Sequence, residues 1–190
     1  MREMNSDAIY IALGANLPSG DLTPRQTLAA ALAALEDDGE IAVAARSSDW
    51  SSPAWPDPAD PAYVNAVAQL ETALSPRALL DRLHAVEAAF GRERTVRNAP
   101  RPLDLDLVDF RGCVDADAQG LEIPHPRARE RAFVLLPLAE IAPDWTHPQS
   151  GEGIAALIAA LSKTDRDATC KLQPVDPHTS ASLAFAGREG

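Results

Sequence analysis

The sequence of 190 residues is poor in cysteine and contains no long hydrophobic run. Its two cysteines, Cys113 and Cys170, lie far apart and form no Cys-x-x-Cys motif. This argues against a disulfide framework or a zinc knuckle and favours a reducing, cytoplasmic location. No stretch approaches the ~18 apolar residues of a membrane helix, so we expect no membrane partner. Residues 1–7 are polar and include acids, unlike a signal peptide.

Positive charge is also scarce, and most of it is arginine. The formal net charge of −11 speaks against a nucleic-acid partner, because binding to the phosphate backbone requires a broad basic surface. The chain has two lysines, whereas eight of its 17 basic residues are arginines between Arg92 and Arg131. Guanidinium groups suit phosphate, so this concentration indicates a local anion site. A solvated surface without a ligand is the alternative, and charge alone does not decide between the two.

The common nucleotide-binding motifs are missing as well. Neither Gly-x-x-x-x-Gly-Lys-Ser/Thr nor Gly-x-Gly-x-x-Gly occurs, so a P-loop and a dinucleotide-binding fold are not supported. No Ser–His–Asp or Cys–His grouping stands out either. With 46% hydrophobic and 24% charged residues, the composition is that of a globular domain, and the length is sufficient for its own core.

Hydrophobic periodicity predicts alternating strands and helices. Strand patterns cover residues 8–13, 41–50, 63–72 and 103–110. Two helices are predicted to begin at Thr23-Pro24 and Ser75-Pro76, where a capping hydroxyl precedes a proline suited to the first turn. The order strand–helix–strand–strand–helix–strand is typical of the ferredoxin-like α+β fold (βαββαβ). In that fold an antiparallel sheet carries both helices on one face.

The C-terminal part looks less regular. Between Leu121 and Ala142 we expect only short elements, because prolines interrupt the segment. Residues 154–161 fit a short amphipathic helix. The remainder mixes polar and small residues without periodicity. We therefore expect one domain over residues 1–163 and a flexible tail over residues 164–190.

The sharpest chemical feature is Leu-Asp-Leu-Asp-Leu at residues 103–107. Side chains alternate along a strand, so Asp104 and Asp106 share one face while the leucines occupy the other. Two carboxylates about 7 Å apart suit a hard divalent cation, and Mg²⁺ is typically held by one or two carboxylates together with substrate phosphates. The alternative is the polar face of an ordinary strand. Four arginines within residues 92–101, directly ahead of the pair, favour a metal-bound polyphosphate.

Two further sets of residues are candidates for ligand binding. His125 lies between two prolines and is followed by three arginines by residue 131, which suits a phosphate contact as well as a structural histidine. The proline-rich loop with Trp55, followed by Tyr63 and Asn65, offers aromatic faces and an amide. Such groups stack on and hydrogen-bond to a flat heterocycle, although they also serve to pack a loop.

Four segments, in order along the chain, resemble the 6-hydroxymethyl-7,8-dihydropterin pyrophosphokinase family of folate biosynthesis. They are residues 10–17 (YIALGANL), 61–67 (PAYVNAV), 97–108 (RNAPRPLDLDLV) and 123–143, beginning with IPHP. The third resembles the family signature, and the resemblance as a whole covers about residues 9–161. One such segment is modest evidence, but four in the same order are strong evidence.

The resemblance implies a ferredoxin-like fold and transfer of the β,γ-pyrophosphoryl group of ATP to the pterin hydroxymethyl group, with release of AMP. It implies that Asp104 and Asp106 bind two Mg²⁺ ions and that Arg92 and Arg101 act with them in catalysis. The implied ATP-binding residues are Glu87, Arg94, Arg97, His125 and Arg131. The implied pterin-binding residues are Ser52, Pro53, Trp55, Tyr63, Asn65 and Phe133. We expect a monomer, with no partner beyond the two small substrates.

Four positions depart from the family pattern. Asn98 stands where a tryptophan is frequent, in a loop about one residue shorter than usual, and His84 stands where a glutamine is common. Pro126 and Gly120 also differ from residues seen in the family. None of these touches the aspartate pair, so we expect activity with an altered affinity for ATP. We also expect deletion of the chain after Ser162 to leave that activity largely intact.

Three other functions remain open from the residues alone. A kinase that moves only the γ-phosphoryl group needs the same metals and arginines. A non-catalytic ferredoxin-like binding module has no use for a second carboxylate on the face of Asp104. A ferredoxin-like RNA binder is disfavoured by the acidity and by the shortage of aromatic residues on the strand at residues 103–110.

Overall fold

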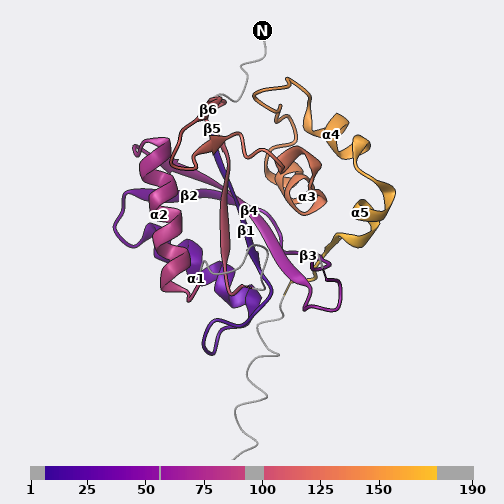
Figure 1. Ribbon diagram of the computed structural model, residues 1–190, viewed down its shortest axis with the longest axis horizontal. Coiled ribbons are helices and arrows are strands. Elements are labelled where there is room, and N and C mark those ends of the chain that lie inside the picture. Colours follow the sequence, from indigo (N-terminus) through magenta and orange to yellow (C-terminus); the bar gives the residue numbers. More distant parts are fainter. Residues whose placement is uncertain (1–6, 56, 93–100, 175–190) are drawn as a thin grey trace, which may run out of the picture.

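The computed structural model describes residues 7–55, 57–92 and 101–174, which form a mixed α/β arrangement around an antiparallel sheet (Figure 1). In chain order the elements are β1 (Ile9–Ala15), α1 (Pro24–Glu36), β2 (Ile41–Arg46), β3 (Trp50–Ser52), β4 (Tyr63–Thr72), α2 (Pro76–Ala89), β5 (Asp104–Phe110), β6 (Asp115–Ala116), β7 (Glu122–Ile123), a 3-10 turn (Ala128–Glu130), α3 (Ala132–Ile141), α4 (Ile154–Ala160), α5 (Lys163–Ala168) and β8 (Cys170–Lys171).

The main sheet has the strand order β5-β1-β4-β3-β8, and β2 also pairs with β4. All of these pairings are antiparallel. Strand β4 is long enough for β3 to pair with its first residues and β2 with its last ones. The predicted antiparallel sheet with packed helices is confirmed, and β4 covers the predicted residues 63–72.

Helices α1 and α2 cover one face of the sheet. Both begin as predicted: the Thr23 and Ser75 side chains accept hydrogen bonds from backbone N–H groups in the first turn, and a proline opens each helix. Their buried residues, such as Leu28 and Leu83, pack against Ile11 and Leu13 of β1. These positions of β1 alternate with those that face the other side of the sheet.

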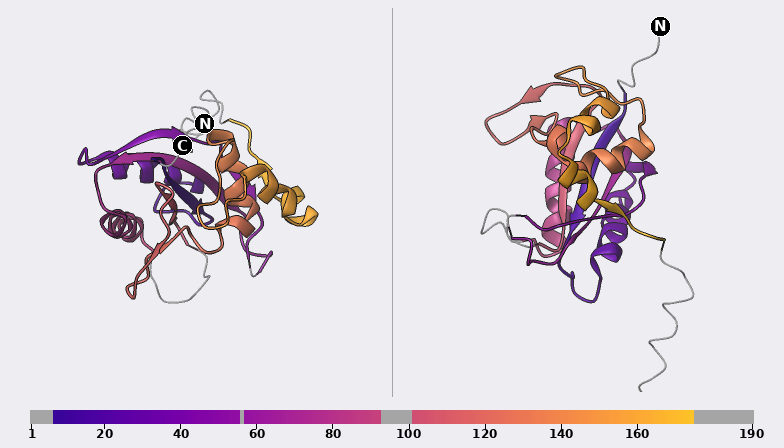
Figure 2. Two further views of the ribbon diagram at one scale, coloured as in Figure 1. Left: turned by 90° about the horizontal axis from the view of Figure 1, so that it is seen from above. Right: turned by 90° about the vertical axis from the view of Figure 1, so that its right-hand side faces the viewer.

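Helices α3 and α4 cover the opposite face (Figure 2), so the prediction of only short elements up to residue 142 was wrong. Helix α3 runs through Pro137, which lacks the N–H for one helical hydrogen bond. Buried apolar neighbours, including Val134, Leu135 and Leu138, offset that loss, because burial of each contributes about 1.5–3 kcal/mol. The proline pattern hid a helix whose stability comes from the core.

Residues 164–171, assigned above to a flexible tail, instead form most of α5 and all of β8. Strand β8 pairs with β3 at the edge of the sheet. The segment has little hydrophobic periodicity of its own, since its order depends on backbone pairing with a distant strand. Residues 175–190 lie outside the described residues. In the part of the chain that is described, no helix combines the length and apolar character needed to cross a membrane.

Candidate active site

The floor of the candidate site consists of two rows of residues across the sheet. Gly14 of β1 pairs with Asn65 of β4 on one side and Asp104 of β5 on the other. Ala12 pairs in the same way with Val67 and Asp106. Residues opposite one another in antiparallel strands point to the same face, and here it is the face that carries α3. The sheet register thus brings both aspartates and Asn65 to one surface.

Small residues at the centre of this floor leave space for a ligand. A Cβ atom added to Gly14 would lie 3.4 Å from the Asn65 side-chain oxygen and 3.7 Å from the Tyr63 ring. Above the floor is a pocket of about 310 Å³, a size suited to a small molecule. Of the predicted site residues it is lined by Ser52, Pro53, Trp55, Tyr63, Asn65, Arg101, Asp104, Asp106, Arg131 and Phe133.

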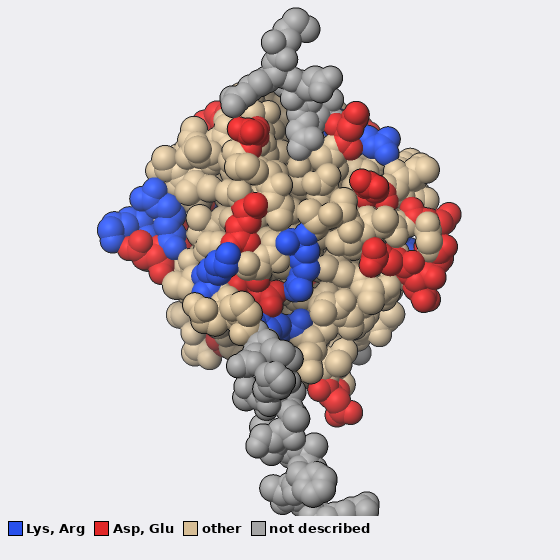
Figure 3. Space-filling view, turned by 180° about the vertical axis from the view of Figure 1, so that it is seen from behind, with Lys and Arg blue, Asp and Glu red and all other residues tan. Residues whose placement is uncertain are grey.

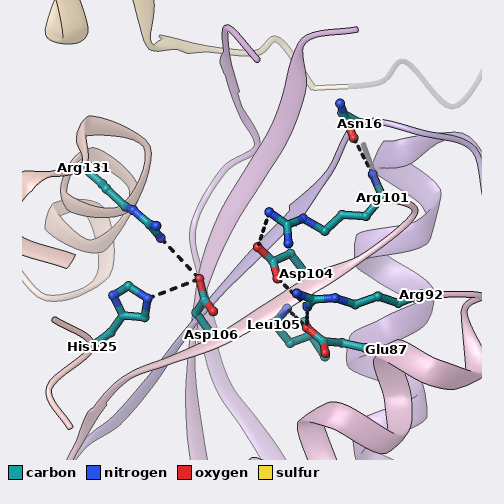
Figure 4. A network of polar contacts seen from close by, with 9 residues as sticks. All are labelled: Asn16, Glu87, Arg92, Arg101, Asp104, Leu105, Asp106, His125 and Arg131. Carbon is teal, nitrogen blue, oxygen red and sulfur yellow. Dashed lines mark hydrogen bonds and ion pairs between the residues drawn. The ribbon is translucent and has the colours of Figure 1, made fainter. Parts of the chain in front are cut away.

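Asp104 is surrounded by cationic side chains (Figure 4). Arg92 donates from Nη1 to Asp104 Oδ1 at 2.5 Å, and Arg101 Nη2 lies 3.6 Å from Asp104 Oδ2. Burial opposes the charge of Arg101, but neighbouring Asp104 and Tyr63 outweigh it, so the pKa of Arg101 is raised. Within the described part of the chain, the Nε atom of Arg101 is buried without a hydrogen-bond partner, which leaves it available to an anionic ligand.

Glu87 of α2 does not line the pocket but anchors the start of β5. It is almost completely buried, accepts the backbone N–H of Leu105 at 2.7 Å and contacts Arg92. It therefore fixes both the strand that carries the aspartates and an arginine beside them. Arg94 and Arg97, both predicted to bind ATP, lie outside the described residues, as does Asn98.

Asp106 has its own pair of basic neighbours. Arg131 Nη1 lies 3.4 Å and His125 Nε2 3.8 Å from Asp106 Oδ2. Burial, followed by the charge of Asp104, raises the pKa of Asp106 despite these neighbours. Burial lowers the pKa of His125, which accepts the Arg127 N–H at Nδ1 and therefore turns Nε2 toward the carboxylate. His125 itself is not among the residues that line the pocket.

The other half of the pocket is mostly neutral. The buried Asn65 side chain donates to Ser52 Oγ at 3.0 Å and to the Trp50 carbonyl at 3.3 Å. Both bonds use the amide nitrogen, and no described residue donates a hydrogen bond to Oδ1, which can therefore accept one from a ligand. Phe133, in the first turn of α3, has the Arg131 guanidinium 5.5 Å from its ring centroid. Aromatic, hydroxyl and amide groups together suit a flat, polar heterocycle.

Sequence reasoning missed several residues of the site. Asn16 accepts the Arg101 N–H at 3.0 Å and donates to the Pro61 carbonyl at 3.1 Å, so one amide joins the two halves of the pocket. Arg127 lies over the Trp55 ring at 5.7 Å. Residues of α5 line the pocket as well. Asn16 and Arg127 both lay in segments with a recognisable pattern, but those patterns indicated neither the role of the Asn16 side chain nor the contact of Arg127 with Trp55.

The donor set fits a divalent cation only in part. Among the described residues, no group of three or more His, Cys, Asp or Glu side chains is arranged to hold a metal ion. Asp104 and Asp106 are nevertheless neighbouring carboxylates, and the pKa of Asp106 is raised; a bound cation would stabilise the ionised form of both. Because Mg²⁺ often keeps waters and binds substrate phosphates, two protein ligands are sufficient when a polyphosphate supplies the remainder.

The side of the molecule seen from behind in Figure 3 carries both signs of charge. On the face shown in Figure 3, basic side chains lie next to acidic ones near the centre, and acidic side chains gather at one edge. On this face the basic side chains form no continuous basic surface of the kind that binding to a phosphate backbone requires.

Comparison with known proteins identifies the family. The sequence profile of 7,8-dihydro-6-hydroxymethylpterin-pyrophosphokinase (HPPK) matches residues 10–143. The chain belongs to this family. Its relatives include 2-amino-4-hydroxy-6-hydroxymethyldihydropteridine pyrophosphokinases of Methylorubrum extorquens, 40% identical over 80% of this chain and 92% of the relative, and of Pseudomonas aeruginosa, 42% identical over 80% and 90%. The enzyme of that name from Synechocystis is 45% identical, over 63% of this chain and 60% of its own length.

Solved structures support the HPPK fold. A Plasmodium falciparum HPPK-DHPS chain with pterin and p-hydroxybenzoate matches 92% of this chain with a TM-score of 0.65 at 11% identity. The wild-type HPPK-DHPS of the same organism matches 80% with a TM-score of 0.58 at 12% identity. The present chain covers 49% and 44% of these longer chains. The likeness therefore concerns the fold of one part of them.

Proposed function

We propose that this HPPK-family protein transfers the pyrophosphoryl group of ATP to the hydroxymethyl group of 6-hydroxymethyl-7,8-dihydropterin and releases AMP, a step of folate biosynthesis. The observation that carries this proposal is one pocket with two unlike halves. One half holds Asp104 and Asp106, each beside its own basic side chains, and the other holds Asn65 and Phe133. A polyphosphate and a heterocycle can thus meet over the small residues between them.

In this reaction the hydroxymethyl oxygen attacks the β-phosphorus of ATP. The bond from that phosphorus to the α,β-bridging oxygen breaks, AMP leaves with the electron pair, and the hydroxyl proton passes to water. Arg92 and Arg101 would neutralise charge on the transferring group, while Arg131 and His125 hold phosphates from the opposite side. Catalysis of this kind depends mainly on positioning and on charge stabilisation.

The neutral half would hold the pterin. Phe133 and Tyr63 supply apolar faces to the ring. Asn65 would accept a hydrogen bond from the ring edge at Oδ1, because its Nδ2 already donates to Ser52 and to the Trp50 carbonyl. Pro53 and Trp55 complete this side of the pocket. Arg94 and Arg97 remain proposed ATP contacts from the segment outside the described residues, and Glu87 acts by fixing Arg92 and β5.

Two Mg²⁺ ions on Asp104 and Asp106 are part of the proposal. Bound there, Mg²⁺ would neutralise phosphate charge and orient the transferring group. The protein contributes the two carboxylates on one rigid strand and holds each in place with a basic neighbour. Removal of the metal with a chelator should abolish turnover and leave the fold intact.

Finer features of fold and location are also proposals. The order β5-β1-β4 with β2 and β3 beyond β4, and two helices between the strands, supports the ferredoxin-like topology. The free cysteines Cys113 and Cys170 are both exposed, which is consistent with a reducing cytoplasm. A monomeric state stays a prediction that sedimentation analysis would test.

The decisive experiment is to incubate the protein with ATP, Mg²⁺ and 6-hydroxymethyl-7,8-dihydropterin and to identify the nucleotide product. We expect AMP, formed only when the pterin is present. If ADP forms instead, the charged half still binds ATP, but the reaction is transfer of the γ-phosphoryl group. If neither nucleotide forms although the pterin binds, the protein is a binding module and the proposal is wrong.

A further inference from the structure

The pocket has a wall that comes from the C-terminal end of the described chain. Asp165 and Ala168 of α5, with Thr169 directly after it, line the pocket together with the residues of its neutral half. In Figure 1, α5 lies next to β3, on the same side of the sheet as α3. A segment more than 100 residues from β3 in sequence thus closes this side of the site.

The pairing of β8 with β3 sets the position of this wall. Cys170 is opposite Ser51 and Lys171 is opposite Trp50. The same antiparallel register brings Thr169 alongside Ser52, and both side chains are buried. Ser52 in turn accepts the hydrogen bond from Asn65. The wall formed by α5 and β8 therefore lies beside Ser52, which holds Asn65, the proposed hydrogen-bond partner of the heterocycle edge.

Contacts on both sides of β3 hold the segment in place. The Leu172 N–H donates to the Asp49 carbonyl at 2.8 Å, and Arg25 of α1 donates to the Gln173 carbonyl at 2.7 Å. On the α3 side, Lys171 Nζ lies 2.6 Å from Glu140, whose other oxygen accepts the Ser48 N–H at 2.7 Å. The segment is thus fixed to α1, β3 and α3 at once.

We infer that residues 163–173 form a specificity-determining part of the heterocycle subsite, which sets how tightly the pterin is held and how large a ring the pocket admits. This inference rests on the proposed function. Ala168 presents only a methyl group, so α5 leaves room for the ring, and β8 sets the distance of α5 from Asn65. The nucleotide-binding half, on β5 and Arg131, has no such dependence. The earlier expectation that deletion after Ser162 leaves activity intact is therefore replaced by the opposite one.

The first test is Ala168→Phe, compared with Thr164→Phe. Both residues are exposed on α5, so neither change should affect folding. Only Ala168 lines the pocket. We expect Ala168→Phe to raise the KM for the dihydropterin about tenfold, with the KM for ATP and the melting temperature unchanged. Thr164→Phe should match the wild type. Equal KM values for the pterin in the two variants would overturn the inference.

The second test loosens the wall without changing any residue that lines the pocket. Leu172→Pro removes the N–H that bonds to Asp49, whereas Leu172→Ala keeps it. We expect a severalfold rise in the pterin KM for the proline variant beyond that of the alanine variant, with the KM for ATP unchanged. A proline variant that equals the alanine variant in pterin KM would show that β8 does not position the pocket. In both tests the wild-type protein must first form AMP, and its failure to do so would refute the proposed function instead.

Discussion

The two halves of the pocket differ in how they are built. In the charged half, Arg101, Asp104 and Asp106 come from one stretch of 20 residues that also holds Glu87 and Arg92, which support Asp104 and β5 from outside the pocket lining. Arg131 and His125 join Asp106 from a later segment. The neutral half takes residues from β3, β4, α3 and α5, which are spread from residue 52 to residue 169. Most of the charged half is therefore a local motif, whereas the neutral half is a product of the tertiary fold.

This difference predicts different kinetic roles. In the proposed reaction, the charged side chains around the aspartate pair would interact with a phosphoryl group whose charge distribution changes, so their loss should lower kcat. The neutral groups would contact a pterin ring that is unchanged between ground and transition state, so their loss should mainly raise the KM for the pterin. Substitutions in each half test this division.

The largest effect is expected for Asp104→Asn and Asp106→Asn. Each removes a proposed metal ligand, and we expect turnover to fall by about 1,000-fold. The fold should persist, because these side chains are only partly buried and the amide nearly preserves their shape. Steady-state kinetics and thermal melting measure the two quantities. Asp115→Asn, on the exposed strand β6, is the matched control. An active Asp106→Asn protein would remove that residue from the metal site.

A smaller loss is expected for Arg101→Ala, about 100-fold in kcat with little change in the pterin KM. Arg101→Lys should recover part of the rate, because lysine restores the charge but not the planar fork. Arg77→Ala, which removes a partly exposed ion-pair partner of Asp117 away from the pocket, serves as control. A change confined to the pterin KM would move Arg101 to the other half of the pocket.

In the neutral half, Phe133→Leu should raise the pterin KM about fivefold and leave kcat within about twofold, since it removes a flat face worth about 0.5–1.5 kcal/mol. The leucine keeps most of the apolar volume, so the start of α3 should stay in place. A loss in kcat as large as that of Arg101→Ala would contradict the proposed division.

The smallest effect is expected at the rim, where Arg127 lies over the exposed Trp55 ring. Cation–π contacts at exposed sites contribute about 0.5–1 kcal/mol, so Arg127→Ala should raise the pterin KM about two- to fivefold. A double-mutant cycle with Trp55→Leu isolates the contact. Strict additivity of the two substitutions would show that the contact has no part in binding.

How far sequence predicted the site follows the same division. Alternation along residues 103–107 was sufficient to bring Asp104 and Asp106 to one face, and capping signals located the starts of α1 and α2. The contribution of Ala168 was not predictable, because α5 and β8 depend on hydrogen bonds to β3 rather than on their own periodicity. Helix α3 was missed because Pro137 is locally unfavourable and only the burial of its neighbours offsets this. Local sequence patterns were sufficient to predict the aspartate pair, whereas the shape of the pocket could be described only from the tertiary structure.

The Asn16 side chain has a consequence for how the two substrates influence each other. Its amide is almost fully buried and bonds to Arg101 on one side and to the Pro61 carbonyl, two residues ahead of Tyr63, on the other. Any ligand that restrains one of these segments also restrains the amide that both share. The second ligand then loses less conformational entropy on binding, so ATP and the pterin should bind with positive cooperativity. By linkage, each must strengthen the other's binding by the same factor.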